Sequence, residues 1–183
     1  MKISQLSNCL LVSSPALQDN DFQRSVIYVF EHSTRGALGL MMNKPMTAKL
    51  DELFKHLDIE MTDQSIAEIP VLYGGPVSKD HGFVLYLQEP TEEEPIAKIE
   101  LSASKELLTS IADNRGPKQF SLLLGYTGWG KGQLEEEISQ GDWLVAPVDF
   151  DVLFSLPIER RWLHTGKLIG VDLTRLSLQT GRA

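Results

Sequence analysis

The residues best suited to chemistry lie in a glycine-rich segment, Gly125 to Ile138, with the sequence GYTGWGKGQLEEEI. A buried strand, a glycine-rich turn and a helix N-terminus can together bind an anion, because free backbone N–H groups and the helix dipole favour negative charge. The spacing fits neither GxxxxGK[ST] nor GxGxxG, so a nucleotide-phosphate loop is not predicted. The candidate binding residues in this segment are Gly128, Trp129, Gly130 and Gln133.

Three consecutive glutamates in the same segment weigh against an anionic ligand. Glu135, Glu136 and Glu137 fall in the first turns of the predicted helix and already offer negative charge to its dipole. The alternative is a tight turn built from glycines, with Trp129 packed in the core and Gln133 or a glutamate capping the helix. We favour this structural interpretation.

A second candidate site depends on a predicted β-hairpin. Residues 25–32 (SVIYVFEH) are rich in β-branched and aromatic side chains, and residues 37–43 (ALGLMMN) return after a four-residue turn. This turn places His32 opposite Ala37. The first strand has apolar residues on both faces, so we expect it to be central in its sheet.

The open end of that hairpin gathers two cations. If Ser25 faces Lys44, four residues cluster there: Arg24, Ser25, Asn43 and Lys44. Adjacent cations are unfavourable unless something negative lies between them. Asp19 and Asp21 can supply it within an internal salt-bridge cluster, and an anionic ligand or an acidic partner is the functional alternative. We favour the internal cluster, since many charge clusters are satisfied internally.

Other reactive residue types lack partners at useful spacing. Cys9 is the only cysteine, which excludes an intrachain disulfide and a cysteine zinc site, and it sits in an apolar strand where a thiol is normally inert. Ser13 and Ser14 lack the GxSxG elbow that presents a nucleophile. The four histidines are scattered, at positions 32, 56, 81 and 164. We predict no catalytic residue, no metal and no cofactor.

The whole chain has ordinary globular composition. Its 183 residues are 42% hydrophobic and 23% charged, with a net charge of −8. This length suits one buried core, so residues 1–183 are expected to form one domain. The acidic balance disfavours direct binding to nucleic acid or anionic membrane, and no apolar run is long enough for a membrane helix. We expect the protein to be cytoplasmic. The sequence does not define its oligomeric state.

Strands and helices alternate without regular βαβ order, which predicts an α+β fold with a mixed or largely antiparallel sheet. Thr47 is expected to cap a helix with Leu50, Leu53, Phe54 and Leu57 on its apolar face. An acidic loop spans 89–95, and the tail 171–183 has no clear pattern. The other predicted strands are 8–13, 70–73, 82–88, 96–101, 120–126 and 142–146, and the other helices 104–112, 130–140, 149–154 and 157–170.

Several motifs along nearly the whole chain resemble the YqgE/AlgH family of bacterial proteins. They are SSPALQDNDFQRSVIYVFEH and GALGLMMNKP (13–45), YGGPV and GFVLY (73–86), GYTGWGKGQLEEEISQGDWL (125–144) and LFSLPIERRW (153–162). The resemblance implies an α+β fold with a bifurcated, partly barrel-like sheet surrounded by helices. It implies no established activity, cofactor or substrate, although one member was named a putative transcriptional regulator. The sequence departs from the family pattern at His81, where arginine is usual, and at Tyr86, where histidine is common.

Three functions follow for comparison. A non-enzymatic module that binds a protein or small ligand, and is regulatory in some contexts, agrees best with the missing catalytic signature. Direct DNA binding is disfavoured by the charge of −8. An enzyme acting on an anionic metabolite would use Arg24 and Lys44 or the glycine-rich segment.

Overall fold

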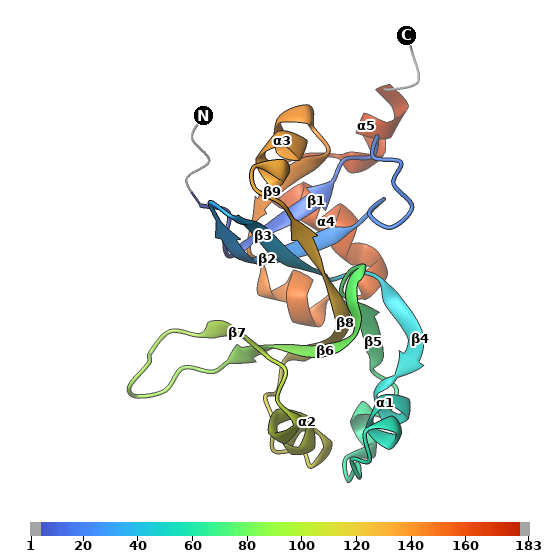
Figure 1. Cartoon of the computed structure of the whole chain (residues 1–183), viewed down its shortest axis with the longest axis vertical. Helices are drawn as coiled ribbons and strands as arrows, with labels where there is room; N and C mark the ends of the chain where they lie inside the picture. The colour runs from blue at the N-terminus through green and yellow to red at the C-terminus, as the bar shows by residue number, and fades with distance from the viewer. Residues whose placement is uncertain (1–4, 180–183) are drawn as a thin grey trace.

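A nine-stranded mixed sheet organises the computed structural model, which describes residues 5–179 (Figure 1). Its main path runs β4-β5-β8-β3-β2-β1-β9, and β6 branches from β8 to carry β7. Among the strand pairs of the described residues, β5–β8 is parallel and the others are antiparallel. The predicted α+β class and bifurcated sheet are confirmed, but the sheet does not close into a barrel in this part of the chain. The strands are β1 (Cys9–Ser13), β2 (Val26–Ser33), β3 (Gly36–Met41), β4 (Pro45–Lys49), β5 (Pro70–Tyr73), β6 (Val77–Gln88), β7 (Lys98–Ser102), β8 (Phe120–Trp129) and β9 (Trp143–Pro147).

The long strand β8 joins the two halves of the sheet. Its first half pairs with β5 and β6, and its last three residues pair with β3. The predicted glycine-rich turn is therefore wrong over residues 127–129, because the strand continues beyond its predicted end at residue 126 to Trp129. Gly125 has a φ of +73°, and a Cβ on it would overlap the Gly75 carbonyl oxygen. These glycines allow two backbones to lie in contact where the sheet branches.

The helices lie in two groups, with α1 and α2 at one end of the molecule and α3 and α5 at the other (Figure 1). The helix predicted over 104–112 is confirmed as α2, and Ser104 caps it, its Oγ accepting from the Leu107 N–H at 3.1 Å. Thr47 caps no helix: it lies in β4, and α1 begins at Leu50 without a side-chain cap. The helices are α1 (Leu50–His56), α2 (Lys105–Ala112), α3 (Gln133–Gln140), α4 (Arg161–Leu168) and α5 (Leu173–Gln179), with 3-10 turns at Gln64–Ile66 and Ile158–Arg160 and a π-helical turn at Asp151–Ser155.

The tail also differs from its prediction. The segment after residue 171 contains α5, which begins beside Asp172, whose Oδ1 accepts from the Thr174 N–H at 3.0 Å. Side-chain acceptance by Asp just before a helix is an ordinary capping signal, and it was missed in the sequence. Residues 180–183 of the predicted patternless tail lie outside the described residues.

A β-bulge shifts the predicted hairpin register. His32 does lie opposite Ala37, as expected. Phe30 is an extra residue between Val29 and Glu31, so beyond it the pairing changes by one position and Ile27 faces Met41. The hairpin therefore remains, while its open end is offset by one residue from the predicted pairing of Ser25 with Lys44.

Candidate functional site

The glycine-rich segment forms a closed hydrogen-bond network around Glu137. The indole N–H groups of Trp129 and Trp143 both donate to Glu137 Oε2 at 2.8 Å. Gln133 Nε2 donates to Glu137 Oε1 at 2.8 Å, and Gln133 Oε1 accepts from the Gly130 N–H at 2.9 Å. Trp129 is buried in the core. The predicted packing of Trp129 in the core is confirmed, but neither Gln133 nor a glutamate caps α3. The Gly130 N–H already has an intramolecular acceptor.

The predicted cation cluster is held together by backbone carbonyls. Lys44 Nζ donates to the Gln23 carbonyl at 2.6 Å, and the Arg24 guanidinium lies 4.8 Å from the centroid of the Trp162 ring. Asn43 makes the central ties, because Nδ2 donates to the Arg24 carbonyl and Oδ1 accepts from the Val26 N–H, both at 2.8 Å. Although the pairing at this end of the hairpin is shifted by one residue, these two hydrogen bonds of Asn43 hold it beside residues 24–26.

The hydrogen bonds of this cluster are internal, but the Lys44 charge is only partly compensated, because among residues 5–179 neither Asp19 nor Asp21 forms an ion pair with it. Burial, and then the neighbouring Arg24 charge, lower the pKa of Lys44, while Asp21 opposes them. The Ser25 hydroxyl donates to the Phe22 carbonyl at 2.6 Å, and Ser25 is fully buried. Ligand binding by these residues stays a prediction, and the contacts give them structural partners.

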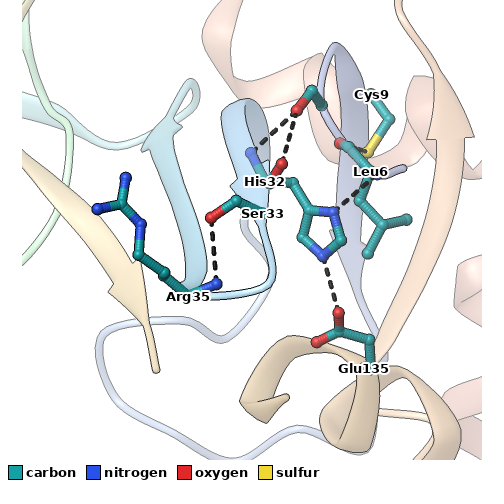
Figure 2. Close-up of polar contacts among 7 residues, drawn as sticks. Leu6, Cys9, His32, Ser33, Arg35 and Glu135 are labelled. Atoms are coloured by element: carbon teal, nitrogen blue, oxygen red, sulfur yellow. Dashed lines mark hydrogen bonds and ion pairs between the residues drawn. The ribbon is translucent and has the colours of Figure 1, made fainter. Parts of the chain in front are cut away.

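The sequence did not indicate a partly buried pair formed by His32 and Glu135 (Figure 2). His32 Nδ1 accepts from the Leu6 N–H at 3.2 Å, so the ring proton lies on Nε2, which donates to Glu135 Oε1 at 2.8 Å. Burial raises the pKa of the Glu135 carboxyl, but hydrogen bonds from its own N–H and from His32 outweigh it, and the net pKa is lowered. The pair fastens α3 to the N-terminal segment.

Cys9 and the family-variant positions show no cooperating group. Burial raises the pKa of the Cys9 thiol to about 11, and its Sγ lies 2.9 Å from the Leu6 carbonyl oxygen. His81 is exposed on the irregular part of β6, and Tyr86 is half-buried opposite Phe120. Within residues 5–179, no group of three or more histidine, cysteine or acidic side chains could hold a metal.

A mainly apolar hollow lies between α1 and α2, over β6 and β8; we call it the α1–α2 groove. Its cavity volume is about 560 Å³. Leu53 and Leu57 of the predicted amphipathic helix face it, while Leu50 and Phe54 of the same helix are fully buried beneath. The complete lining is Leu53, His56, Leu57, Lys79, Asp80, Gly82, Phe83, Val84, Ala103, Lys105, Leu108, Leu122 and Leu124.

The groove combines apolar walls with a mainly basic rim. Lys79 and Lys105 line it, and in the described part of the chain neither has a carboxylate within ion-pair distance. Lys79 Nζ lies 5.7 Å from the centroid of the Tyr73 ring. Asp80 is the one acidic residue in the lining. A mostly apolar cavity with a few charged groups at its edge is typical of ligand sites.

These features define an α+β protein whose sheet branches at one long strand and whose helices frame a ligand-sized hollow. No helix in residues 5–179 has the length and apolar character needed to cross a membrane. The chain belongs to the AlgH-like family, whose model matches residues 10–174. The function of that family is uncharacterised.

Relatives and solved structures agree with this assignment. A UPF0301 protein of Coxiella burnetii (strain Dugway 5J108-111) is 46% identical over 183 residues, covering 100% of this chain and 99% of the relative. A UPF0301 protein of Thioalkalivibrio sulfidiphilus is 40% identical, covering 98% of each. The solution structure of AlgH from Pseudomonas aeruginosa matches with a TM-score of 0.76 at 34% identity, covering 100% of this chain and 97% of that one.

Proposed function

We propose that this protein is a non-enzymatic binding module and that the α1–α2 groove takes a small molecule with an apolar chain and an acidic head group. The observation that carries this proposal is the groove itself: its volume of about 560 Å³ lies in the range of small-molecule sites. Its leucines provide apolar surface, and Lys79 and Lys105 provide charge without an acidic partner.

The dimensions favour a small molecule over a long peptide. The wall formed by α2 spans eight residues, which corresponds to about 12 Å at the usual helical rise. Peptide helices that bind in grooves use anchors over at least two turns and need a comparable or greater length. A fatty-acid-like chain fits a hollow this short, with its carboxylate at the lysine rim.

Octanoate is a direct probe, compared with octanol and octylamine by calorimetry and by amide shifts in NMR spectra. We expect octanoate to bind most tightly and to shift amides of α1, α2 and β6. Lys105→Glu should weaken octanoate by about fivefold, since exposed charges contribute at most about 1 kcal/mol. Ala103→Phe adds bulk at an exposed lining position and should abolish binding.

The matched control is Lys131→Glu, which makes the same charge change at an exposed position outside the groove. It should leave octanoate binding unchanged. Equal affinity for all three probes would refute the acidic head group. Binding that survives Ala103→Phe, or amide shifts confined to another face, would refute the groove as the site.

A further inference from the structure

Arg161, the first residue of α4, is a buried cation without an acidic partner. The residue is only 5% exposed, and no carboxylate in residues 5–179 lies within ion-pair distance of it. Nε donates to the Leu156 carbonyl at 3.0 Å and Nη1 to the Met42 carbonyl at 2.6 Å. A guanidinium has five N–H donors, so three of them have no partner in the described part of the chain.

The positive charge on Arg161 persists at neutral pH. Burial lowers its pKa to about 10, and the nearby charge of Glu159 partly offsets that effect. A buried charge costs several kcal/mol unless a counter-charge and hydrogen bonds compensate it. Two backbone carbonyls supply hydrogen bonds and no net charge, so the electrostatic cost of burying Arg161 is only partly met.

Arg161 lines a hollow of about 370 Å³ between β5, the start of β8 and the turn that follows the π-helical segment; we call it the Arg161 pocket. Its charged lining residues are Arg161 and Lys118, and no acidic residue lines it, although the chain as a whole carries a net charge of −8. Lys118 Nζ lies 3.2 Å from Glu89 Oε1, so its charge has a partner. The lining charge that forms no ion pair within residues 5–179 is that of Arg161, which Glu159 offsets only in part.

The remaining walls are mostly apolar, with Leu72, Phe120, Phe154 and Ile158 among them. We propose that the Arg161 pocket binds a small monocarboxylate with a compact apolar body, whose carboxylate pairs with the Arg161 guanidinium. One guanidinium neutralises one carboxylate, and planar carboxylates match its donors in paired hydrogen bonds. A phosphate dianion would bring a second charge into apolar surroundings with no second unpaired cation.

This proposal is independent of the α1–α2 groove, because the two hollows share no lining residue. The competing explanation is that Arg161 only tethers α4 to the end of β3 through the Met42 carbonyl. A tether needs neither an anion nor an open pocket. Ligand discrimination between an acid and its neutral isostere therefore separates the two explanations.

Benzoate is the probe, with benzamide as its neutral isostere and benzylamine as its cationic counterpart. Affinities are measured by calorimetry, and sites are mapped by NMR amide shifts. We expect benzoate to shift amides around Ser121 and Ile158 and to bind about tenfold or more tightly than benzamide, as charge-assisted hydrogen bonds imply. Arg161→Lys should weaken benzoate by a similar factor.

Ile158→Trp keeps Arg161 and fills the pocket, so it should abolish benzoate binding even if Arg161→Lys proves poorly folded. Arg160→Lys, at an exposed neighbouring position, is the matched control and should bind like the wild type. Octanoate binding at the α1–α2 groove should survive both pocket variants.

Any of the following results would overturn the proposal: equal binding of benzoate and benzamide, unchanged affinity in folded Arg161→Lys, binding that persists in Ile158→Trp, or displacement of benzoate by an equal concentration of inorganic phosphate. Absence of benzoate binding at millimolar concentration to the wild-type protein would overturn it as well.

Discussion

Replacing Glu137 by alanine should be among the most destabilising single changes in the region around α3. Its carboxylate accepts from two indole N–H groups and one amide, all at 2.8 Å. Trp129 and Trp143 are 7% and 3% exposed, so their N–H groups have little access to water. Each buried donor left without an acceptor costs about 1–3 kcal/mol.

The expected loss of unfolding free energy is about 2–4 kcal/mol for the two indole donors together. This value lies in the lower part of the range obtained by adding the costs of both donors, because Glu137 is only half-buried. Typical stabilities are about 5–15 kcal/mol, so the change is large on that scale. Glu137→Gln should cost about 1 kcal/mol, because one oxygen can still accept from the indoles while the amide opposes Gln133 Nε2.

Urea unfolding followed by far-UV circular dichroism measures these differences without relying on tryptophan emission. Glu136→Ala is the matched control, since Glu136 is exposed and accepts one bond, from Gln140 Nε2 at 3.2 Å. It should stay within about 0.5 kcal/mol of the wild type. If Glu137→Ala and Glu136→Ala unfold at the same urea concentration, the network around Glu137 does not stabilise the fold as argued.

Three further predictions concern the backbone, the thiol and pH. Gly75→Ala should lower the free energy of unfolding by about 3 kcal/mol or more, because its φ is +153° and a Cβ would overlap the backbone of β8. Gly132 also has a positive φ, but its surroundings are open, so Gly132→Ala should cost only about 1 kcal/mol in the same urea assay. The Cys9 thiol, with a pKa of about 11, should react with Ellman's reagent at pH 8 far more slowly in the folded protein than in urea; equal rates would contradict its burial. Because the pKa of Glu135 is lowered in the folded protein, its carboxylate stabilises the fold above the unfolded pKa of about 4.3, and this stabilisation is lost as the pH falls through the lower folded pKa. The loss of stability caused by Glu135→Gln should therefore be larger at pH 7 than at pH 3. ¹⁵N NMR should find the His32 ring proton on Nε2.

Local signals in the sequence were sufficient for the hairpin and for α2. The strand at 25–32 and the helix at 104–112 are determined by neighbouring residues, and both agree with the structure. Thr47 was assigned to a helix because a hydroxyl before an amphipathic run is a capping pattern. It instead lies in β4, which pairs with β5 more than twenty residues further along the chain. Such long-range pairing overrides a local preference.

The glycine-rich segment was misread for a related reason. Glycine followed by a helix suggests a turn, and turns are the commonest use of glycine in loops. The Gly125 conformation is set by the approach of Gly75, which lies fifty positions earlier in the chain. The Glu137 network was nevertheless foreseeable in part, because a buried tryptophan near several glutamates needs an acceptor for its N–H.

The contrast between the Arg24–Lys44 cluster and Arg161 shows where charge reasoning from sequence reaches its limit. The Arg24–Lys44 cluster could be noticed in the sequence because a predicted hairpin brings its cations together. The same hairpin also brings backbone carbonyls close to these cations, and Lys44 donates to one of them. Arg161 is one of two consecutive arginines, and its Met42 partner lies 119 positions away. Its burial, and the lack of an ion pair to it within residues 5–179, are set by the tertiary structure. Water can solvate the exposed Arg24 and the half-buried Lys44, but it has little access to Arg161. Because a buried charge is costly unless a counter-charge compensates it, Arg161 is the stronger candidate for binding an anion.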